Sequence, residues 1–224
     1  GIPPPPPPDL TGTIVTSSEP VAVFFGNDLT SVMASGDTID SNSALIAQRL
    51  AELSLTVWRK VTVGDDRALL EAELKAMADT ADLVIVNGGL GPTIDDLTAE
   101  ILAAVAGVVI EEHPEAIAHL EKWCAQRNLP LNEANRKQAL LPAGCKLIPN
   151  DIGSAVGFEM TVGNCRIMCT PGVPGELARM LDHMVEDLGT ALDSPPERDI
   201  LRLQTFGLGE SSAQQLIADR LPDW

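Results

Sequence analysis

Apolar and polar residues alternate along most of this chain with the periods of strands and helices. Short apolar runs typical of strands occur at residues 21–25, 55–63 and 83–86. Apolar residues with helical spacing occur at 43–53, 67–80 and 98–105. The run Leu83-Val84-Ile85-Val86 has no polar interruption, which favours a strand buried on both faces. Strands separated by helices predict a parallel sheet with helices on both faces.

The second half of the chain adds an antiparallel element to this pattern. A helix is predicted at 114–127, with Ile117, Leu120 and Trp123 near one face. The segments 158–162 and 165–169, joined by Gly163 and Asn164, predict a β-hairpin. A closing helix is expected at 176–188, with Pro174 at its start. The predicted fold class is therefore α/β, with a mostly parallel sheet plus a β-hairpin.

Changes in composition divide the chain into three parts. Residues 1–19 include an unbroken proline run at 3–8 and predict a polyproline tail or linker. Residues 20–193 contain the alternating strands and helices and are expected to form the main domain. After a break at Ser194, residues 194–224 hold one strand pattern and one helix pattern, which predicts the start of a second α+β domain.

The charge of the chain restricts its partners. The 224 residues carry 15 Lys and Arg against 32 Asp and Glu, a formal net charge of −17. We therefore expect no binding to nucleic acid or to an anionic membrane surface, since both need clustered cations. No apolar run approaches the roughly 18 residues of a membrane span, and no signal-peptide pattern opens the chain. These features favour a cytoplasmic protein.

Cysteine and histidine are too few and too scattered for a soft-metal site. The four cysteines form no CxxC pair, and the chain has three histidines. We expect no zinc, haem or flavin site and reduced, structural thiols. A phosphate ligand would need backbone dipoles, a few local cations or a hard divalent metal.

Residues 88–98, here called the glycine loop, carry the strongest chemical signal. They connect the buried strand at 83–86 to the helix at 98–105, so their N–H groups would lie at the positive end of a helix dipole, which suits a phosphate. The expected phosphate contacts are Gly88, Gly89, Leu90, Gly91, Pro92 and Thr93. The alternative is a tight turn that only lets helix and sheet approach.

Acidic residues near the ends of predicted strands suggest a cation. Asp95 and Asp96 would repel a phosphate unless a proton or a divalent metal such as Mg²⁺, Mn²⁺ or Co²⁺ lay between them. Asp28 and Asp65 follow two other predicted strands, whose carboxyl ends should meet at the same edge of the sheet. The alternative is that these acids only cap helices.

Several segments together resemble a known family. They are Asp40 to Asn42, residues 63–66, the glycine loop, and residues 135–139, 141–144, 149–150 and 170–174. In this order they are similar to the N-terminal, molybdopterin-binding-like domain of the competence/damage-inducible protein A (CinA) family. Residues 206–211 look like the start of that family's middle domain.

The resemblance implies a three-layer α/β/α fold with a pocket for a nucleotide or pterin. It further implies metal-dependent hydrolysis of a pyrophosphate such as ADP-ribose. We also expect a homo-oligomer, either dimer or trimer. Catalytic roles would fall to Asp96 and Asp65, and metal binding to Asp95, Asp96 and Asp28. Further ligand contacts would come from Asp40, Asn42, Gly172, Val173 and Pro174.

One turn departs from the family pattern. The family's first strand usually ends in Gly-Asp-Glu, whereas this chain has Gly26-Asn27-Asp28. If that turn supplies a metal ligand or a base, catalysis would be impaired while ligand binding survived. Two alternatives to the enzyme therefore stay open: a non-catalytic pterin- or nucleotide-binding module related to molybdenum-cofactor synthesis, and an assembly domain.

Overall fold

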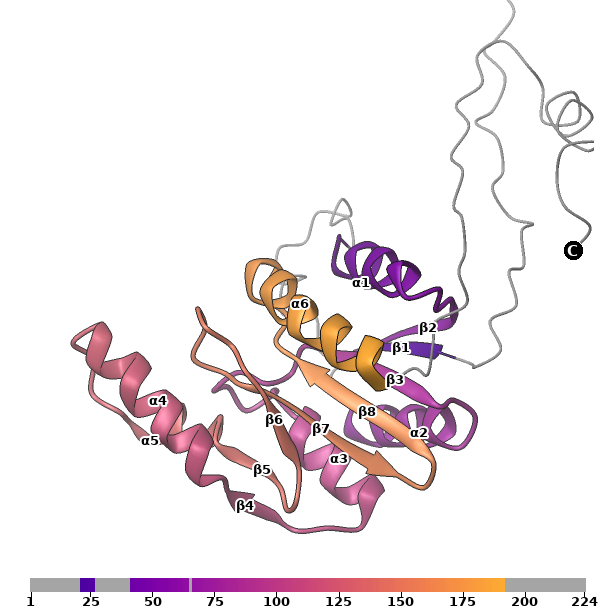
Figure 1. Ribbon diagram of the computed structural model, residues 1–224. Helices are drawn as coiled ribbons and strands as arrows, with labels where there is room; N and C mark the ends of the chain where they lie inside the picture. The colour runs from indigo at the N-terminus through magenta and orange to yellow at the C-terminus, as the bar shows by residue number, and fades with distance from the viewer. Residues whose placement is uncertain (1–20, 27–40, 65, 192–224) are drawn as a thin grey trace, which may run out of the picture.

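A six-stranded sheet forms the centre of the computed structural model, which describes residues 21–26, 41–64 and 66–191 (Figure 1). Its strands are β1 (Val21–Gly26), β2 (Val57–Val63), β3 (Leu83–Asn87), β6 (Lys146–Ile148), β7 (Gly157–Val162) and β8 (Cys165–Thr170). They lie in the order β2-β1-β3-β8-β7-β6. The first four are parallel, and β7 pairs antiparallel with both β8 and β6. The predicted α/β class, with a mostly parallel sheet and a hairpin, is confirmed.

Helices cover both faces of the sheet and give three layers. They are α1 (Ser41–Glu52), α2 (Arg67–Ala78), α3 (Thr98–Ala106), α4 (Pro114–Gln126), α5 (Glu133–Lys137) and α6 (Pro174–Ala191). On one face α1 and α6 pack together, and Ile46 and Leu181 share a buried cluster with Ile85. On the other face α2 and α3 place Leu74 and Leu102 in a second cluster. All five residues of β3 are buried between these clusters, as its uninterrupted apolar run predicts.

Local chemistry explains where several elements begin and end. The Asp66 carboxylate accepts a hydrogen bond of 3.0 Å from the Leu69 amide and caps α2, as the sequence predicts for one of the two acids in this turn. Helix α4 begins at Pro114, whose missing N–H is tolerated at this position. Helix α3 ends at Gly107, which has the left-handed φ of 69° that glycine accepts without strain.

Four short elements were not predicted by the sequence pattern. They are β6, α5 and a separate two-stranded antiparallel sheet made of β4 (Ile110–Glu112) and β5 (Leu140–Pro142). Each has only three to five residues, which is too short for a 3.6- or 2-residue period to show. Strand β2 also begins two residues later than expected: Ser54 has a φ of 61°, and the Leu55 amide still donates to the Leu50 carbonyl at the end of α1.

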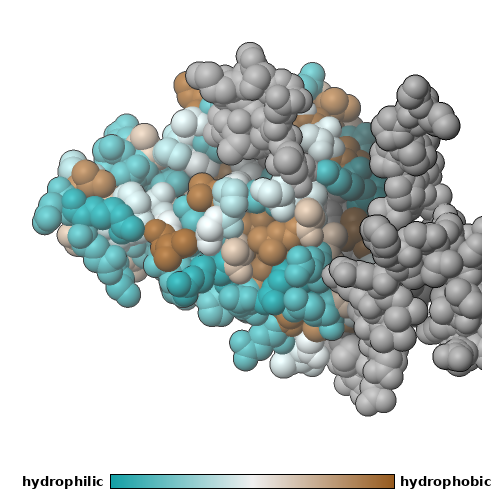
Figure 2. Space-filling model, turned by 90° about the horizontal axis from the view of Figure 1, so that it is seen from above, coloured by the Kyte–Doolittle hydropathy of each residue, from teal (hydrophilic) through white to brown (hydrophobic). Residues whose placement is uncertain are grey.

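The surface reflects the composition of the chain. On the face shown in Figure 2, hydrophilic residues form most of the coloured surface and hydrophobic residues occur in separate patches. Among the described residues, no helix is long and apolar enough to cross a membrane. The predicted tail at 1–19 and the predicted second-domain start at 194–224 lie outside the described residues.

Candidate functional site

The carboxyl ends of three neighbouring strands meet at one edge of the sheet. Residue 25 of β1 pairs with Asn87 at the end of β3, and Asn87 pairs with Thr170 at the end of β8. The chain continues from β3 into the glycine loop, and the Gly88 amide donates to the Thr170 carbonyl at 2.8 Å. Ligands of open α/β sheets bind beyond such carboxyl ends, so this edge is the candidate site.

The side chain of Asn87 links the segments that meet at this edge. It is 5% exposed, and its amide donates to the Thr170 hydroxyl at 3.1 Å and to the Pro171 carbonyl at 2.7 Å. Its oxygen accepts a hydrogen bond of 2.9 Å from Asn42 in the first turn of α1. Asn42 also donates to the Gly172 carbonyl at 2.8 Å. The structure thus brings together Asn42 and Gly172, two of the predicted ligand contacts.

Sequence reasoning missed Asn87 itself. The signal that could have identified it is its place: Asn87 is a polar residue at the end of a buried apolar strand, directly before two glycines. The predicted contacts that follow β8 lie beside the glycine loop, because a Cβ added at Gly172 would be 3.5 Å from the Gly88 Cα. Val173 is 52% exposed there, and Pro174 is the first residue of α6.

Hydrogen bonds turn the carbonyl groups of the glycine loop away from its amides. Gly88 and Gly89 have φ angles of 102° and 69°. The Gly88 carbonyl accepts from the Thr98 hydroxyl at 2.8 Å, and the Gly89 carbonyl accepts from the Thr98 amide at 3.2 Å. Among the described residues, no hydrogen bond uses the N–H groups of Gly89, Leu90 and Gly91. Successive free amides in such a loop form a concavity that suits an anion.

The two acids of the loop have different surroundings. The Asp96 side chain is 6% exposed, and its Oδ2 accepts from the Thr93 amide at 2.8 Å and the Thr93 hydroxyl at 2.6 Å. Asp95 is more exposed, and a hydrogen bond from the Thr93 side chain, its own backbone amide and the nearby Lys137 hold its pKa below the ordinary value. Since Thr93 has one hydroxyl proton, its hydroxyl donates to one of the two carboxylates at a time. Because its pKa is lowered, Asp95 is ionised at neutral pH.

The other predicted acids cannot be compared with this geometry. Asp28, Asp40 and Asp65 lie outside the described residues, so their expected roles stay predictions. Within residues 21–26, 41–64 and 66–191, no three His, Cys, Asp or Glu side chains gather closely enough to hold a metal ion by themselves. Any metal at this edge would need ligands from phosphate, water or residues outside that part of the chain.

Comparisons with known proteins agree with this fold. The sequence matches the family described as "Probable molybdopterin binding domain" over residues 12–190. A CinA-like protein of Colwellia psychrerythraea is 51% identical over 200 residues, which cover 89% of this chain and 45% of that protein. The chain belongs to the CinA family. The predicted resemblance is confirmed.

Other relatives show how the length of this chain compares with theirs. A CinA-like protein of Citrifermentans bemidjiense is 41% identical over 192 residues, 85% of this chain and 46% of that protein. The chain thus spans somewhat less than half the length of these relatives. A solved structure of the protein CinA from Thermoplasma acidophilum has a TM-score of 0.67 at 29% identity, covering 76% of this chain and 98% of its own.

A more distant structure shows the fold alone. The molybdopterin biosynthesis enzyme MoaB from Thermus thermophilus has a TM-score of 0.50 at 22% identity, covering 78% of this chain and 94% of its own. The CinA-family domain therefore shares its architecture with a protein of molybdenum-cofactor synthesis.

A second loop of this CinA-family domain, residues 150–155, contacts the first turn of α6. Asn150 is 1% exposed; its amide donates to the Glu176 carboxylate at 2.8 Å, and its oxygen accepts from the Gly153 amide at 3.0 Å. From α4, a ring nitrogen of His119 lies 2.9 Å from the Gly153 carbonyl. These contacts connect α4 to the start of α6, one turn after Val173. Burial raises the pKa of Glu176, opposed by Asn150 and by His119.

Replacing Glu176 with glutamine is expected to raise the free energy of unfolding at pH 7 and to leave it unchanged near pH 4. Because the folded-state pKa of Glu176 lies above the ordinary 4.5, its stabilising contribution is complete below pH 4.5 and is lost as the pH rises through the folded-state pKa. Glutamine keeps an acceptor for Asn150 without the buried charge. Urea titrations at both pH values measure the difference. A variant that is less stable at pH 7 would show that the interactions of the carboxylate with Asn150 and His119 outweigh its burial.

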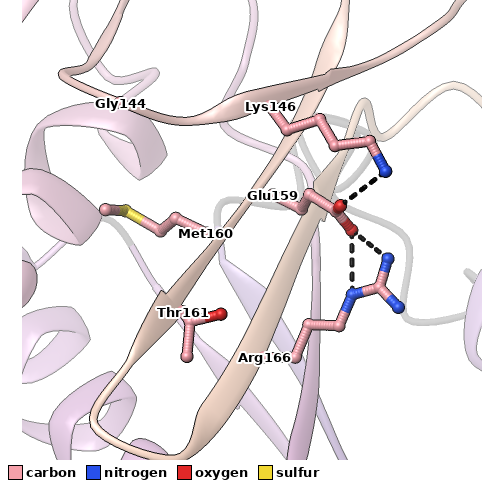
Figure 3. Close-up of a pocket in the computed structure, with 6 residues that line it drawn as sticks. All are labelled: Gly144, Lys146, Glu159, Met160, Thr161 and Arg166. Atoms are coloured by element: carbon pink, nitrogen blue, oxygen red, sulfur yellow. Dashed lines mark hydrogen bonds and ion pairs between the residues drawn. The ribbon is translucent and has the colours of Figure 1, made fainter. Parts of the chain in front are cut away.

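A cavity of about 270 Å³ lies away from the candidate site, near the amino end of β8 (Figure 3). Its lining includes Lys146, Glu159 and Arg166; each of the two cations pairs with Glu159 and with Asp187 of α6. Lys146 lies 3.1 Å from Glu159, and Arg166 contacts both acids. These ion pairs link α6 to the hairpin, and the exposure of Lys146 and Asp187 keeps their contribution to stability small.

Proposed function

We propose that this CinA-family domain binds a phosphorylated nucleotide or pterin at the carboxyl edge of its sheet and, with a divalent cation, hydrolyses a nucleotide pyrophosphate such as ADP-ribose. The observation that carries the proposal is the glycine loop, whose amides at 89–91 have no partner among the described residues while its carbonyls at 88 and 89 are bound by Thr98. On a protein of net charge −17, backbone N–H groups are a suitable means of holding a phosphate.

The described residues fit a hard cation that is shared with the ligand. Asp95 supplies an ionised carboxylate at the loop, and Asp96 is its neighbour. Mg²⁺ typically uses one or two carboxylates together with substrate phosphates and several waters, so a cluster of three acids is not required. When bound, such an ion would neutralise the diphosphate and lower the pKa of an attacking water.

The residues of the chain would have separate roles in this reaction. The amides at 89–91 would bind the diphosphate and stabilise the charge that develops on it during hydrolysis. Asn42 and Asn87 would hold the loop that begins at Gly172 against the glycine loop. With the segments fixed by these bonds, the amides need little rearrangement when the ligand arrives.

One observation favours the non-catalytic alternative. The Asp96 carboxylate already accepts two hydrogen bonds from Thr93, so its present role is to shape the loop. A module that only recognises a phosphorylated pterin or nucleotide would need this loop and no reacting acid. The shared fold with MoaB is compatible with such a module.

A panel of ligands separates the two functions. ADP-ribose, FAD, NAD and molybdopterin analogues are titrated into the protein by calorimetry, alone and with Mg²⁺, Mn²⁺ or Co²⁺, and AMP release is followed by chromatography. We expect ADP-ribose to bind and to be cleaved only with metal. Binding without cleavage for every pair would select the non-catalytic module, and absence of binding throughout would reject both functions.

A further inference from the structure

The amino group of Lys137 contacts the glycine loop from a distant part of the chain. Lys137 is the last residue of α5, and its Nζ donates to the Asp96 carbonyl at 2.9 Å and to the Thr93 carbonyl. Its position is fixed by its own short helix, which Asn132 caps through a bond of 2.8 Å to the Asn135 amide. Arg136 ties the same helix to Glu112 of β4.

These contacts set the direction of two peptide groups. The peptide group is planar, and its N–H points opposite to its C=O. With the carbonyls of Thr93 and Asp96 turned toward Lys137, the N–H groups of the following residues, Ile94 and Leu97, point to the other side of their peptide planes. Thr98 binds the carbonyls of residues 88 and 89 in the same loop. Four loop carbonyls are thus bound by side chains or amides of the protein itself.

Lys137 also supplies positive charge where the loop is acidic. It lowers the pKa of Asp95 by its charge. Asp96, whose carbonyl it binds, is the second acid of the loop. A phosphate that approaches the amides at 89–91 would be repelled by these two carboxylates. The ammonium group of Lys137, bound to the carbonyls of Thr93 and Asp96, reduces that repulsion.

We infer that Lys137 is a positioning residue of the ligand site: it holds the glycine loop in the form whose amides bind a phosphate and offsets the charge of Asp95 and Asp96. This inference rests on the proposed function, since it names the group that prepares the same site. Hydrogen bonds from a charged donor are among the stronger ones in proteins, so their loss should be measurable in affinity.

The test removes the amino group and then restores it. In Lys137→Cys the ammonium is lost, and alkylation with 2-bromoethylamine rebuilds a side chain of nearly the length and charge of lysine. The four native cysteines are buried, and burial raises the pKa of Cys145 and Cys165 to about 11, so the new thiol is the one that reacts at pH 8.5. Lys122→Cys, at an exposed position on α4, is the matched control.

Two measurements are made on each protein. Calorimetry gives the affinity for ADP-ribose and for inorganic pyrophosphate. Hydrogen exchange without any ligand gives the protection of the hydrogen-bonded loop amides, those of Gly88, Thr93, Asp96 and Thr98. We expect Lys137→Cys to bind at least about tenfold more weakly and to lose loop protection, as the loss of a charged hydrogen-bond donor predicts. Aminoethylation should restore both, and the Lys122 control should match the parent.

The outcomes separate this inference from the proposed function. If the parent binds neither probe, the proposed function is rejected, and loop exchange alone decides whether Lys137 holds the loop. If the parent binds and Lys137→Cys binds equally well, the inference is overturned. It is also overturned if aminoethylation restores neither affinity nor protection, because the loss would then follow from packing and not from the ammonium.

Discussion

Replacing Gly89 with alanine is expected to weaken ADP-ribose binding by about 30-fold or more, which corresponds to roughly 2 kcal/mol. An alanine Cβ at this position would lie 2.3 Å from the Thr98 hydroxyl oxygen. Thr98 must then rotate and give up its hydrogen bond to the Gly88 carbonyl. Without that bond the peptide groups that present the loop amides lose their orientation, so the proposed phosphate contacts are lost as well.

Gly107 offers a matched control for this change. It has the same φ of 69° as Gly89, but a Cβ added there meets nothing within 4 Å. Both alanine variants therefore carry the left-handed strain of about 1–2 kcal/mol, and only the Gly89 variant disturbs Thr98. Calorimetric titration and thermal unfolding of the two proteins give the comparison. Equal affinities in the two variants would show that the glycine loop does not contact the ligand.

The sequence pattern was sufficient for the long elements of the fold. Strand β3 and helices α2, α4 and α6 each present an unambiguous apolar run or stripe, so burial on a defined face follows directly from their periods. Strand β6 has only three residues, and its pairing with β7 depends on contacts that no local period encodes. Short elements of this kind are specified by tertiary packing.

The position of the candidate site followed from the sequence, but its hydrogen bonds did not. A glycine-rich turn between a buried strand and a helix predicts an anion site from local order alone. The pairing of Asn42 with Asn87, 45 residues apart, and of Lys137 with the Asp96 carbonyl, 41 residues apart, depends on how distant segments meet. The direction of the Asp96 side chain was likewise not readable from the sequence, and the structure turns it toward Thr93.

The charge of Asp96 should decide between hydrolysis and binding alone. In Asp96→Asn the size of the side chain is kept, but one of its two oxygens becomes a donor, and the negative charge that a hard cation prefers is lost. If the domain hydrolyses ADP-ribose and the charge of Asp96 takes part, metal-dependent turnover should fall by at least about 100-fold, or ~2.7 kcal/mol of transition-state stabilisation. If it only binds, neither protein turns over; the variant should bind anions equally well or more tightly where repulsion by Asp96 dominates, and more weakly where its hydrogen bonds from Thr93 dominate.

Thr93→Val separates the charge of Asp96 from its role in shaping the loop. Valine removes the hydroxyl that lies 2.6 Å from Asp96 Oδ2. It keeps the hydrogen bond from the backbone amide of residue 93 to Asp96, and the Asp96 carboxylate itself is unchanged. If Asp96 acts mainly by shaping the loop, both variants should weaken ADP-ribose binding, and turnover per bound ligand should fall little in either. If its charge takes part in hydrolysis, Asp96→Asn should lose turnover at saturating ADP-ribose and metal while Thr93→Val keeps most of it. Steady-state rates at saturation, measured together with calorimetric affinities, distinguish these results. A parent protein that binds ADP-ribose but does not cleave it with any of the metals would reject the proposed hydrolysis.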